Sequence, residues 1–189
     1  MASPVIGAVA RSAAPTPIVL IDGPSGAGKS TLADRLVAAW PAATPPALVR
    51  MDDIYPGWDG LDAASELLVT ELLMPLRATG CGRWQRYDWP TREPAEWHPV
   101  AAPLVIEGCG SISRAAAPLA DLRVWLTADD SARKRRALIR DKGGFDAHWD
   151  AWQASFDAFV ARENPVALAD LVVNADAGCT PFEARRVYG

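Results

Sequence analysis

The segment GPSGAGKST, residues 23–31, constrains the fold of this chain more than any other part of its sequence. It follows an apolar run at 17–22 and opens a segment, 30–40, whose leucines recur at helical spacing. It satisfies the pattern G-x-x-x-x-G-K-[ST] between a strand and a helix, which is the context that this motif requires. Glycines let backbone N–H groups curl around phosphate oxygens, and the helix N-terminus adds positive charge. The sequence therefore predicts a loop that binds a nucleoside triphosphate.

Two side chains of this loop have chemistry of their own. Lys29 reaches the outer phosphates in such loops, and the hydroxyl of Ser30 can ligate Mg²⁺. The remaining loop residues offer mainly backbone groups. We expect nucleotide contacts from the following residues: Gly23, Ser25, Gly26, Ala27, Gly28, Lys29, Ser30 and Thr31.

The rest of the chain alternates strand-like and helix-like segments. Apolar runs without clean alternation lie at 17–22, 47–52, 103–108, 122–127 and 169–175. Such runs are typical of strands buried on both faces, as in a parallel sheet. Because helical patterns separate them, we predict an α/β fold with three αβα layers and a mostly parallel five-stranded sheet.

Two of the helical patterns carry specific expectations. Residues 62–80 begin with Asp62 as a plausible N-cap and end at Gly80, and Pro75 is expected to kink or shorten this helix. Residues 145–163 present an aromatic stripe that we interpret as core packing. The stripe consists of Phe145, Trp149, Trp152, Phe156 and Phe159.

Composition limits the classes of protein. The chain has 189 residues, enough for one core without disulfides or structural metals. Its net charge of −4 argues against a general surface for nucleic acid or anionic membranes. Three widely spaced cysteines match neither a disulfide framework nor a zinc site. No apolar run approaches the length of a membrane span, so we expect a cytoplasmic protein.

We expect one domain over 15–176. A mobile or weakly helical lead-in is predicted at 1–14 and a C-terminal tail at 177–189. The expected partner is a small-molecule substrate, with no nucleic acid and no membrane, and a homodimer remains open. The order of both ends of the chain is not predicted.

Phosphate loops occur in several classes of protein. A switch GTPase would carry an N-K-x-D segment after a later strand, and this chain has none. A motor ATPase would carry a strand ending in Asp-Glu, whereas here the run VIEG places a glycine after Glu107. The small-molecule kinases remain, with ATP favoured over GTP.

Asp52 and Asp53 follow the second predicted strand. The carboxyl ends of parallel strands line the ligand crevice, so these carboxylates should lie near the γ-phosphate. A carboxylate there can accept the proton of an attacking hydroxyl or organise the hydration shell of Mg²⁺. The alternative is that the pair caps the following turn.

A strongly basic helix is predicted within a lid at about 129–145. Arg133, Arg136 and Arg140 lie on one face of it, where guanidinium groups can close over phosphates and stabilise the transferring charge. A solvated face neutralised by neighbouring aspartates is the alternative.

With these motifs in place, the chain resembles the uridine kinase and phosphoribulokinase-like family of P-loop kinases over about 17–176. GPSGAGKST is similar to the phosphate loop of that family, and MDDIY, ending at Tyr55, is similar to its acidic segment. The resemblance implies that Asp52, ahead of Asp53, is the catalytic base, and we expect Asp53 and Tyr55 to bind substrate. It also implies a substrate-covering hairpin and a helical lid.

The resemblance assigns further residues. WDGLDA is similar to a segment that grips sugar hydroxyls, which implies that Asp59 accepts from a substrate diol. RYDW is similar to the covering hairpin and implicates Tyr87 and Asp88. LVIEG implies that Glu107 lies near the metal, and ARKRRALIRD is similar to the lid helix. The segment FVARENPVALADLVV resembles the closing helix and last strand beside the adenine.

Two departures bear on the acceptor. Only 54–58 separate the acidic pair from Asp59, fewer residues than in uridine kinases. Where those enzymes carry a base-reading histidine, Arg92 is present and could meet an anionic or carbonyl-rich substrate. The tryptophans of this region either form the wall of a site for an apolar or ring-shaped substrate or pack the hairpin; they are Trp84, Trp89 and Trp97.

We therefore expect an ATP- and Mg²⁺-dependent kinase that phosphorylates a hydroxyl of a nucleoside, sugar or vitamin-like alcohol. Asp52 and Lys29, with Arg133 and Arg136, are the expected catalytic residues, and Ser30 and Glu107 the metal ligands. A nucleoside monophosphate kinase is one alternative, supported by Arg50, Arg83, Arg86 and Arg92. A nucleotide-binding regulatory module is the other. The acceptor itself is not predicted.

Overall fold

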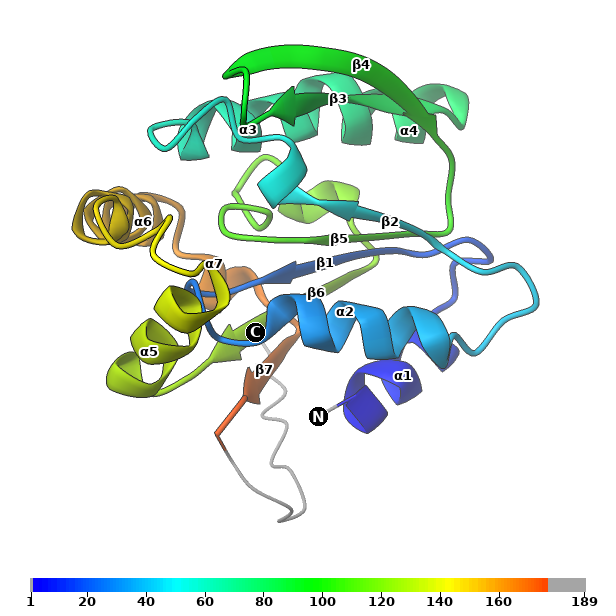
Figure 1. Cartoon of the computed structure of the whole chain (residues 1–189). Coiled ribbons are helices and arrows are strands. Elements are labelled where there is room, and N and C mark those ends of the chain that lie inside the picture. The colour runs from blue at the N-terminus through cyan, green and yellow to red at the C-terminus, as the bar shows by residue number, and fades with distance from the viewer. Residues whose placement is uncertain (1, 177–189) are drawn as a thin grey trace.

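A computed structural model describes residues 2–176, so the predicted tail at 177–189 lies outside the described part. A five-stranded sheet in the order β2-β5-β1-β6-β7 forms its centre (Figure 1). All of its strand pairs are parallel, which confirms the predicted sheet. The strands are β1 Ile18–Asp22, β2 Ala47–Arg50, β5 Leu104–Glu107, β6 Leu122–Thr127 and β7 Leu171–Asn174.

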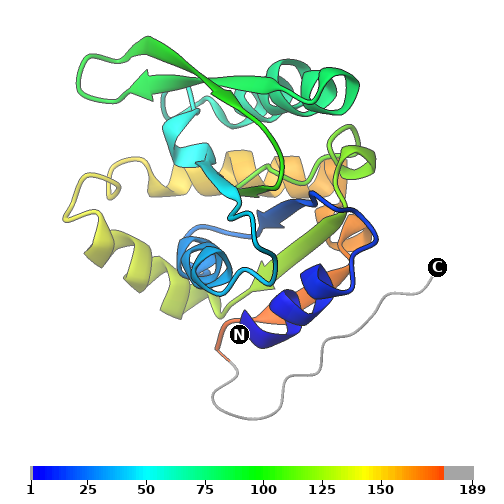
Figure 2. The same ribbon diagram turned by 90° about the vertical axis from the view of Figure 1, so that its right-hand side faces the viewer.

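Helices cover both faces of this sheet, because the central strand β1 has buried apolar side chains on both of its faces. In β1, Ile18 and Leu20 belong to one buried cluster, whereas Val19 and Ile21 belong to another. The first cluster lies under α3 and α6, and the second under α1 and α2 (Figures 1 and 2). These helices are α1 Ala2–Ala10, α2 Lys29–Ala38, α3 Leu61–Leu67 and α6 Trp149–Glu163. The predicted three-layer αβα arrangement is thereby confirmed.

The N-terminal segment is more ordered than a mobile lead-in. Of the two states expected for 1–14, mobile or weakly helical, the described residues adopt the helical one, since α1 packs beside α2. Val5 and Val9 are both buried in the second cluster. Apolar burial by tertiary packing stabilises a helix that is too short to persist alone.

The segment predicted as one helix over 62–80 is divided into three. The helix α3 leads into a π-helical turn, η2, at Leu68–Leu73, and then into α4 at Met74–Thr79. The N-cap is Gly60 rather than Asp62, and Gly80 ends α4 with φ 81°, as predicted. Pro75 lies in α4 directly after the π-helical turn, and the backbone stays helical through Leu73 and Met74. The helix is therefore widened before the proline rather than ended by it.

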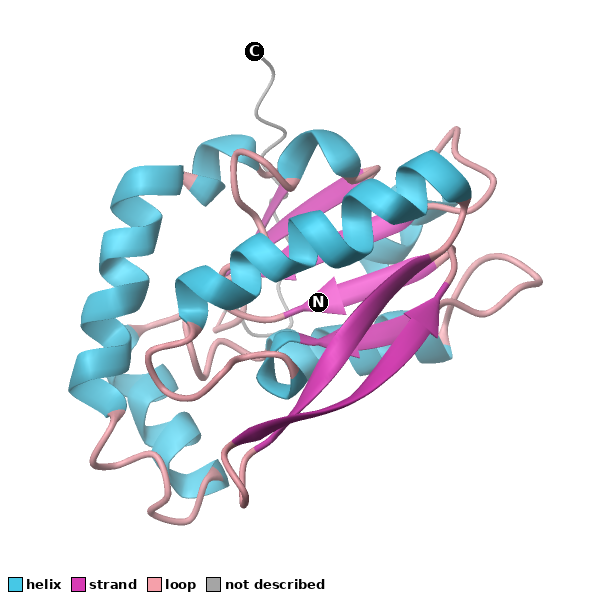
Figure 3. Cartoon of the chain, turned by 90° about the horizontal axis from the view of Figure 1, so that it is seen from above, coloured by secondary structure: helices cyan, strands magenta, loops and turns pink. Residues whose placement is uncertain are grey.

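A separate antiparallel hairpin, β3 Gly82–Asp88 and β4 Glu93–Val100, packs against η2 and α4 (Figures 1 and 3). It lies beyond the β2 edge of the central sheet, beside α3 and α4 (Figure 1), and is the hairpin that the resemblance implied.

The remaining helices follow β6. The basic helix α5, Asp130–Arg140, has Asp129 as its N-cap, whose side chain accepts a hydrogen bond from the Ala132 N–H at 2.9 Å. The short helix α7, Pro165–Leu168, follows α6. The aromatic stripe of 145–163 is buried in the first cluster, as predicted. None of the helices in residues 2–176 is both long and apolar enough to span a bilayer.

Candidate active site

The loop between β1 and α2 is held by hydrogen bonds from its own lysine. Lys29 begins α2 and is buried, and its Nζ donates to the carbonyl oxygens of Gly23 at 2.8 Å and Pro24 at 3.1 Å. It also lies 3.4 Å from Cys109 Sγ, after β5. Gly28 is the N-cap of α2 with φ 93°, a conformation that favours glycine. The ammonium group is thus already placed at the N-terminus of the helix.

Helix α5 packs directly on this loop at Gly26. The φ of Gly26 is 78°, and a Cβ atom there would overlap the carbonyl oxygen of Arg133. Arg136 Nε donates to the Gly26 carbonyl oxygen at 2.9 Å. Because only glycine allows this approach, the loop and α5 form one wall of the cavity described next.

A cavity of about 210 Å³ lies over the loop. Loop residues and the acidic residues at the ends of neighbouring strands line it together. Its lining comprises Ser25, Gly26, Gly28, Lys29, Ser30, Thr31, Asp52, Glu107, Cys109, Arg136, Ala137 and Arg140. Six of the eight expected loop residues and two of the expected lid arginines therefore lie at one place, whereas Gly23 and Ala27 do not line the cavity.

Two carboxylates face this cavity from different strands. Glu107 ends β5, is buried, and accepts from Arg50 Nη1 at 3.1 Å. Burial raises the pKa of Glu107, although the charge of Lys29 and a hydrogen bond with Ser30 oppose that rise. Asp52 lies in the short 3-10 turn η1, Met51–Asp53, directly after β2 and is exposed. Both acids thus lie at the carboxyl edge of the sheet.

This donor set suits Mg²⁺ better than it suits a metal held wholly by protein. Among residues 2–176 no group of three or more His, Cys, Asp or Glu side chains is placed to hold a metal. Mg²⁺ usually takes one or two protein oxygens and completes its shell with water and substrate phosphates. The Ser30 hydroxyl and the Glu107 carboxylate are such oxygens.

Helix α5 carries four arginines, and the three expected to form the lid have different surroundings. Arg136 and Arg140 line the cavity. Arg133 is buried instead; its Nε donates to Asp130 at 2.7 Å, and its guanidinium lies 5.4 Å from the centre of the Trp149 ring. The structure therefore does not bring Arg133 to the cavity wall, since helical spacing alone cannot tell which of the three turns inward.

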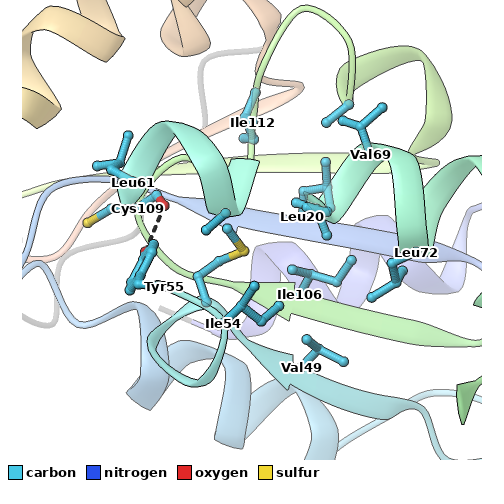
Figure 4. Packing of buried hydrophobic residues seen from close by; sticks show 14 of the residues in the cluster. Leu20, Val49, Ile54, Tyr55, Leu61, Val69, Leu72, Ile106, Cys109 and Ile112 are labelled. Atoms are coloured by element: carbon cyan, nitrogen blue, oxygen red, sulfur yellow. Dashed lines mark hydrogen bonds between the residues drawn. The ribbon is translucent and has the colours of Figure 1, made fainter. Parts of the chain in front are cut away.

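A second cavity of about 170 Å³ adjoins the first. The two share Ser25, Asp52 and Arg140. Aromatic side chains make up most of the remaining lining, which is Tyr55, Trp58, Trp89, Asp141, Phe145 and Trp152. The hydroxyl of Tyr55 donates to the Cys109 carbonyl oxygen at 2.7 Å and connects this wall to the segment after β5 (Figure 4).

Five residues expected to bind substrate line neither cavity: Asp53, Asp59, Tyr87, Asp88 and Arg92. Asp88 accepts from Arg86 and from the Thr91 hydroxyl within the hairpin. Arg92 is exposed in the hairpin turn with φ 59°. Asp59 is also exposed. The short 54–58 connection turns Trp58, not Asp59, toward the cavity.

Some residues of the site were not anticipated from the sequence. Asp22 ends β1 fully buried, and Cys109 contacts both Lys29 and Ser25. The only sequence signal for Asp22 is a carboxylate at the end of an apolar strand. Trp152 and Phe145 were assigned to the core, and they serve as core and as cavity wall.

The parallel sheet and the loop between β1 and α2 define a P-loop NTPase fold. Among solved structures, the chain is similar to a possible uridine kinase from Bacillus stearothermophilus, with a TM-score of 0.64 and 20% identity over 89% of this chain and 94% of that one. It is also similar to phosphoribulokinase from Rhodobacter spheroides, with a TM-score of 0.60 and 17% identity over 84% of this chain and 70% of that one. No family model and no curated protein sequence matches it. The chain therefore has the fold of the uridine kinase and phosphoribulokinase-like P-loop kinases, as its sequence predicted.

Proposed function

We propose that this protein is an ATP- and Mg²⁺-dependent phosphotransferase that moves the γ-phosphoryl group to a hydroxyl of a small metabolite. The placement of Asp52 carries this proposal, because this residue lines both the cavity over the phosphate loop and the adjoining cavity. A carboxylate between a nucleotide and a second molecule can accept the proton of an attacking hydroxyl. The kinase fold adds support, although fold alone does not define chemistry.

Each group of the site has a task in this mechanism. The loop amides and Lys29 hold the phosphates, and Asp52 orients the acceptor hydroxyl and takes its proton. Arg136 and Arg140 place positive charge beside the transferring group. Ser30 and Glu107 would hold Mg²⁺, which when bound neutralises charge that develops on the phosphoryl oxygens.

The arginines bear on the choice between a hydroxyl and a phosphate acceptor. A monophosphate kinase would direct several arginines into the acceptor cavity. Arg50 is paired with Asp34 and Glu107, Arg83 with Glu71, and Arg86 with Glu96 and Asp88. Among residues 2–176 Arg140 is the arginine that lines the second cavity, and it is paired with Asp141. This distribution favours a neutral alcohol.

Phosphate transfer to a panel of nucleosides, sugars, vitamin-like alcohols and nucleotides tests the proposal, with both ADP and phosphorylated product measured. Asp52→Asn is expected to reduce transfer at least about 100-fold, while the Kd of an ATP analogue stays within about threefold. Lys29→Ala is expected to weaken nucleotide binding itself.

The neighbouring carboxylate supplies a matched variant. Asp53 lines neither cavity, so Asp53→Asn is expected to retain transfer within about fivefold. Equal losses in both variants would remove Asp52 from the role of base. Production of ADP without any phosphorylated acceptor would favour the regulatory module instead.

A further inference from the structure

The aromatic wall of the second cavity is formed by segments far apart in the chain, and its rings pack against one another. Trp58 stacks on Phe145, with ring centres 5.1 Å apart and planes within 16°. On the hairpin side Trp58 contacts Trp89 at 4.9 Å. Tyr55 meets Trp152 edge to face at 4.9 Å. Such mutual packing fixes the ring positions before any ligand binds.

The polar atoms of these side chains already make hydrogen bonds within the protein. Trp89 Nε1 donates to the Asp52 carbonyl oxygen at 2.9 Å, and Trp152 Nε1 donates to Ser25 Oγ at 3.0 Å. The Tyr55 hydroxyl donates to the Cys109 carbonyl oxygen. Trp58 is itself stacked on two rings, Phe145 and also His148, whose centre lies 4.5 Å away with planes within 11°. The wall therefore offers a ligand apolar ring atoms rather than hydrogen bonds.

The charged groups that line the cavity are also engaged already. Arg140 and Asp141 form a two-bond pair, with Nε–Oδ1 at 2.7 Å and Nη2–Oδ2 at 3.0 Å. Asp52 lies at the junction with the phosphate-loop cavity, where the proposed function gives it the reacting hydroxyl. A sugar or ribose would place several hydroxyls against apolar rings, and each unsatisfied hydroxyl costs about 1–3 kcal/mol.

The volume of the second cavity agrees with a small ring. A cavity of about 150 Å³ is enough to hold benzene. At about 170 Å³ the second cavity has room for one such ring with a short substituent. The exposed Asp59 supplies no carboxylate there for a vicinal diol.

We propose that the acceptor is a primary alcohol carried on a single flat, weakly polar ring, with the ring against Trp58, Trp89 and Phe145 and the hydroxyl at Asp52. This inference rests on the proposed function. In the step, the alcohol oxygen forms a bond to the γ-phosphorus while the bond from that phosphorus to the β–γ bridging oxygen breaks. The alcohol proton passes to Asp52 and ADP leaves.

The activity test compares ring alcohols with polyols. Benzyl alcohol, pyridinemethanols and pyrimidinemethanols are assayed beside uridine, ribose and glycerol with Mg²⁺-ATP. We expect kcat/KM for at least one ring alcohol to exceed that for every member of the second group by tenfold or more. A polyol or nucleoside as the best acceptor would overturn the inference and leave the kinase standing.

A binding test separates the two proposals. Binding of a pyridinemethanol in the presence of a non-hydrolysable ATP analogue is measured by calorimetry. Trp58→Ala is expected to weaken binding at least tenfold, whereas Trp58→Phe, which keeps a ring, stays within about threefold. Trp97→Leu, on the exposed part of the hairpin, is the matched control and is expected to bind as the original protein does.

If Trp58→Ala does not fold in a thermal melt, Trp89→Leu replaces it with the same expectation. Absence of saturable binding would overturn the ring inference whatever else is phosphorylated. Binding that needs Trp58, together with no transfer to any member of either group of alcohols, would support the ring site and overturn the kinase.

Discussion

The Asp22 carboxylate is fully buried at the end of β1. It accepts hydrogen bonds from the backbone N–H groups of Gly23 at 2.6 Å, Gly110 at 3.1 Å and Ile112 at 2.8 Å. Burial nevertheless raises the pKa of Asp22 to about 6, against these bonds and the charge of Lys29. Asp22 thus joins the phosphate loop to the segment after β5.

A pH dependence follows from this carboxyl group. Its pKa is about 6 in the folded protein and 3.8 ordinarily, so between these values the folded state binds more protons than the unfolded state. Its contribution to the free energy of unfolding is therefore full below about pH 3.8 and declines as pH rises to about 6, by about 3 kcal/mol. Urea titrations at pH 4 to 7 on the original protein and Asp22→Asn isolate the effect, because other carboxyl groups cancel in the difference. A difference independent of pH would contradict the raised pKa.

Single residues also show where sequence reasoning ends. The spacing of Arg133, Arg136 and Arg140 correctly places them on one helix, but whether each reaches the cavity depends on how α5 lies on Gly26. The order of Trp58 and Asp59 likewise leaves open which of them turns inward. These outcomes are decided by tertiary packing, which local periodicity does not record.

At the scale of elements, the contact between α5 and the phosphate loop makes a quantitative prediction. Gly26 and Gly143 both have positive φ, at 78° and 92°, but only at Gly26 would a Cβ meet the backbone of α5. Gly143→Ala is expected to lower the free energy of unfolding by about 1 kcal/mol through backbone strain. Gly26→Ala is expected to cost about 3 kcal/mol because overlap is added. It should also weaken binding of an ATP analogue.

Chemical denaturation and calorimetry check both variants. Equal losses of stability would mean that α5 does not rest on the loop in solution. Unchanged nucleotide affinity in Gly26→Ala would separate the helix from nucleotide binding.

Some helices and strands could be predicted from the sequence and others could not. The strands were predictable because burial on both faces leaves continuous apolar runs such as 103–108. The phosphate loop was predictable because its chemistry needs fixed spacing. The division at Leu68–Leu73 and the burial of Val5 were not, since a π turn and a docked terminal helix depend on what packs against them.

At the scale of the whole molecule, the sheet couples two clusters. Alternate residues of β1 belong to opposite clusters, so neither cluster can lose its packing while the sheet remains intact. We therefore expect a single cooperative unfolding transition for residues in both layers. The αβα architecture was predictable from the alternation of elements, whereas this shared strand needed the strand order.

Urea unfolding of Trp40→Phe measures this coupling. Trp40 packs against the second cluster, so its removal leaves tryptophan fluorescence that reports mainly on the first cluster and the hairpin. Far-ultraviolet circular dichroism reports on helices of both layers. The two midpoints are expected to coincide; a lower midpoint by fluorescence would mean that the aromatic layer unfolds separately.

The shared lining of the two cavities has a consequence for inhibitor design. Ser25, Asp52 and Arg140 border both spaces, so a short linker suffices to join a ring to the terminal phosphate of a nucleotide. Once one half of such a bisubstrate compound is bound, the other half meets its cavity at an effective concentration on the order of millimolar. A tethered compound is therefore expected to inhibit far more strongly than its two halves mixed at equal concentration.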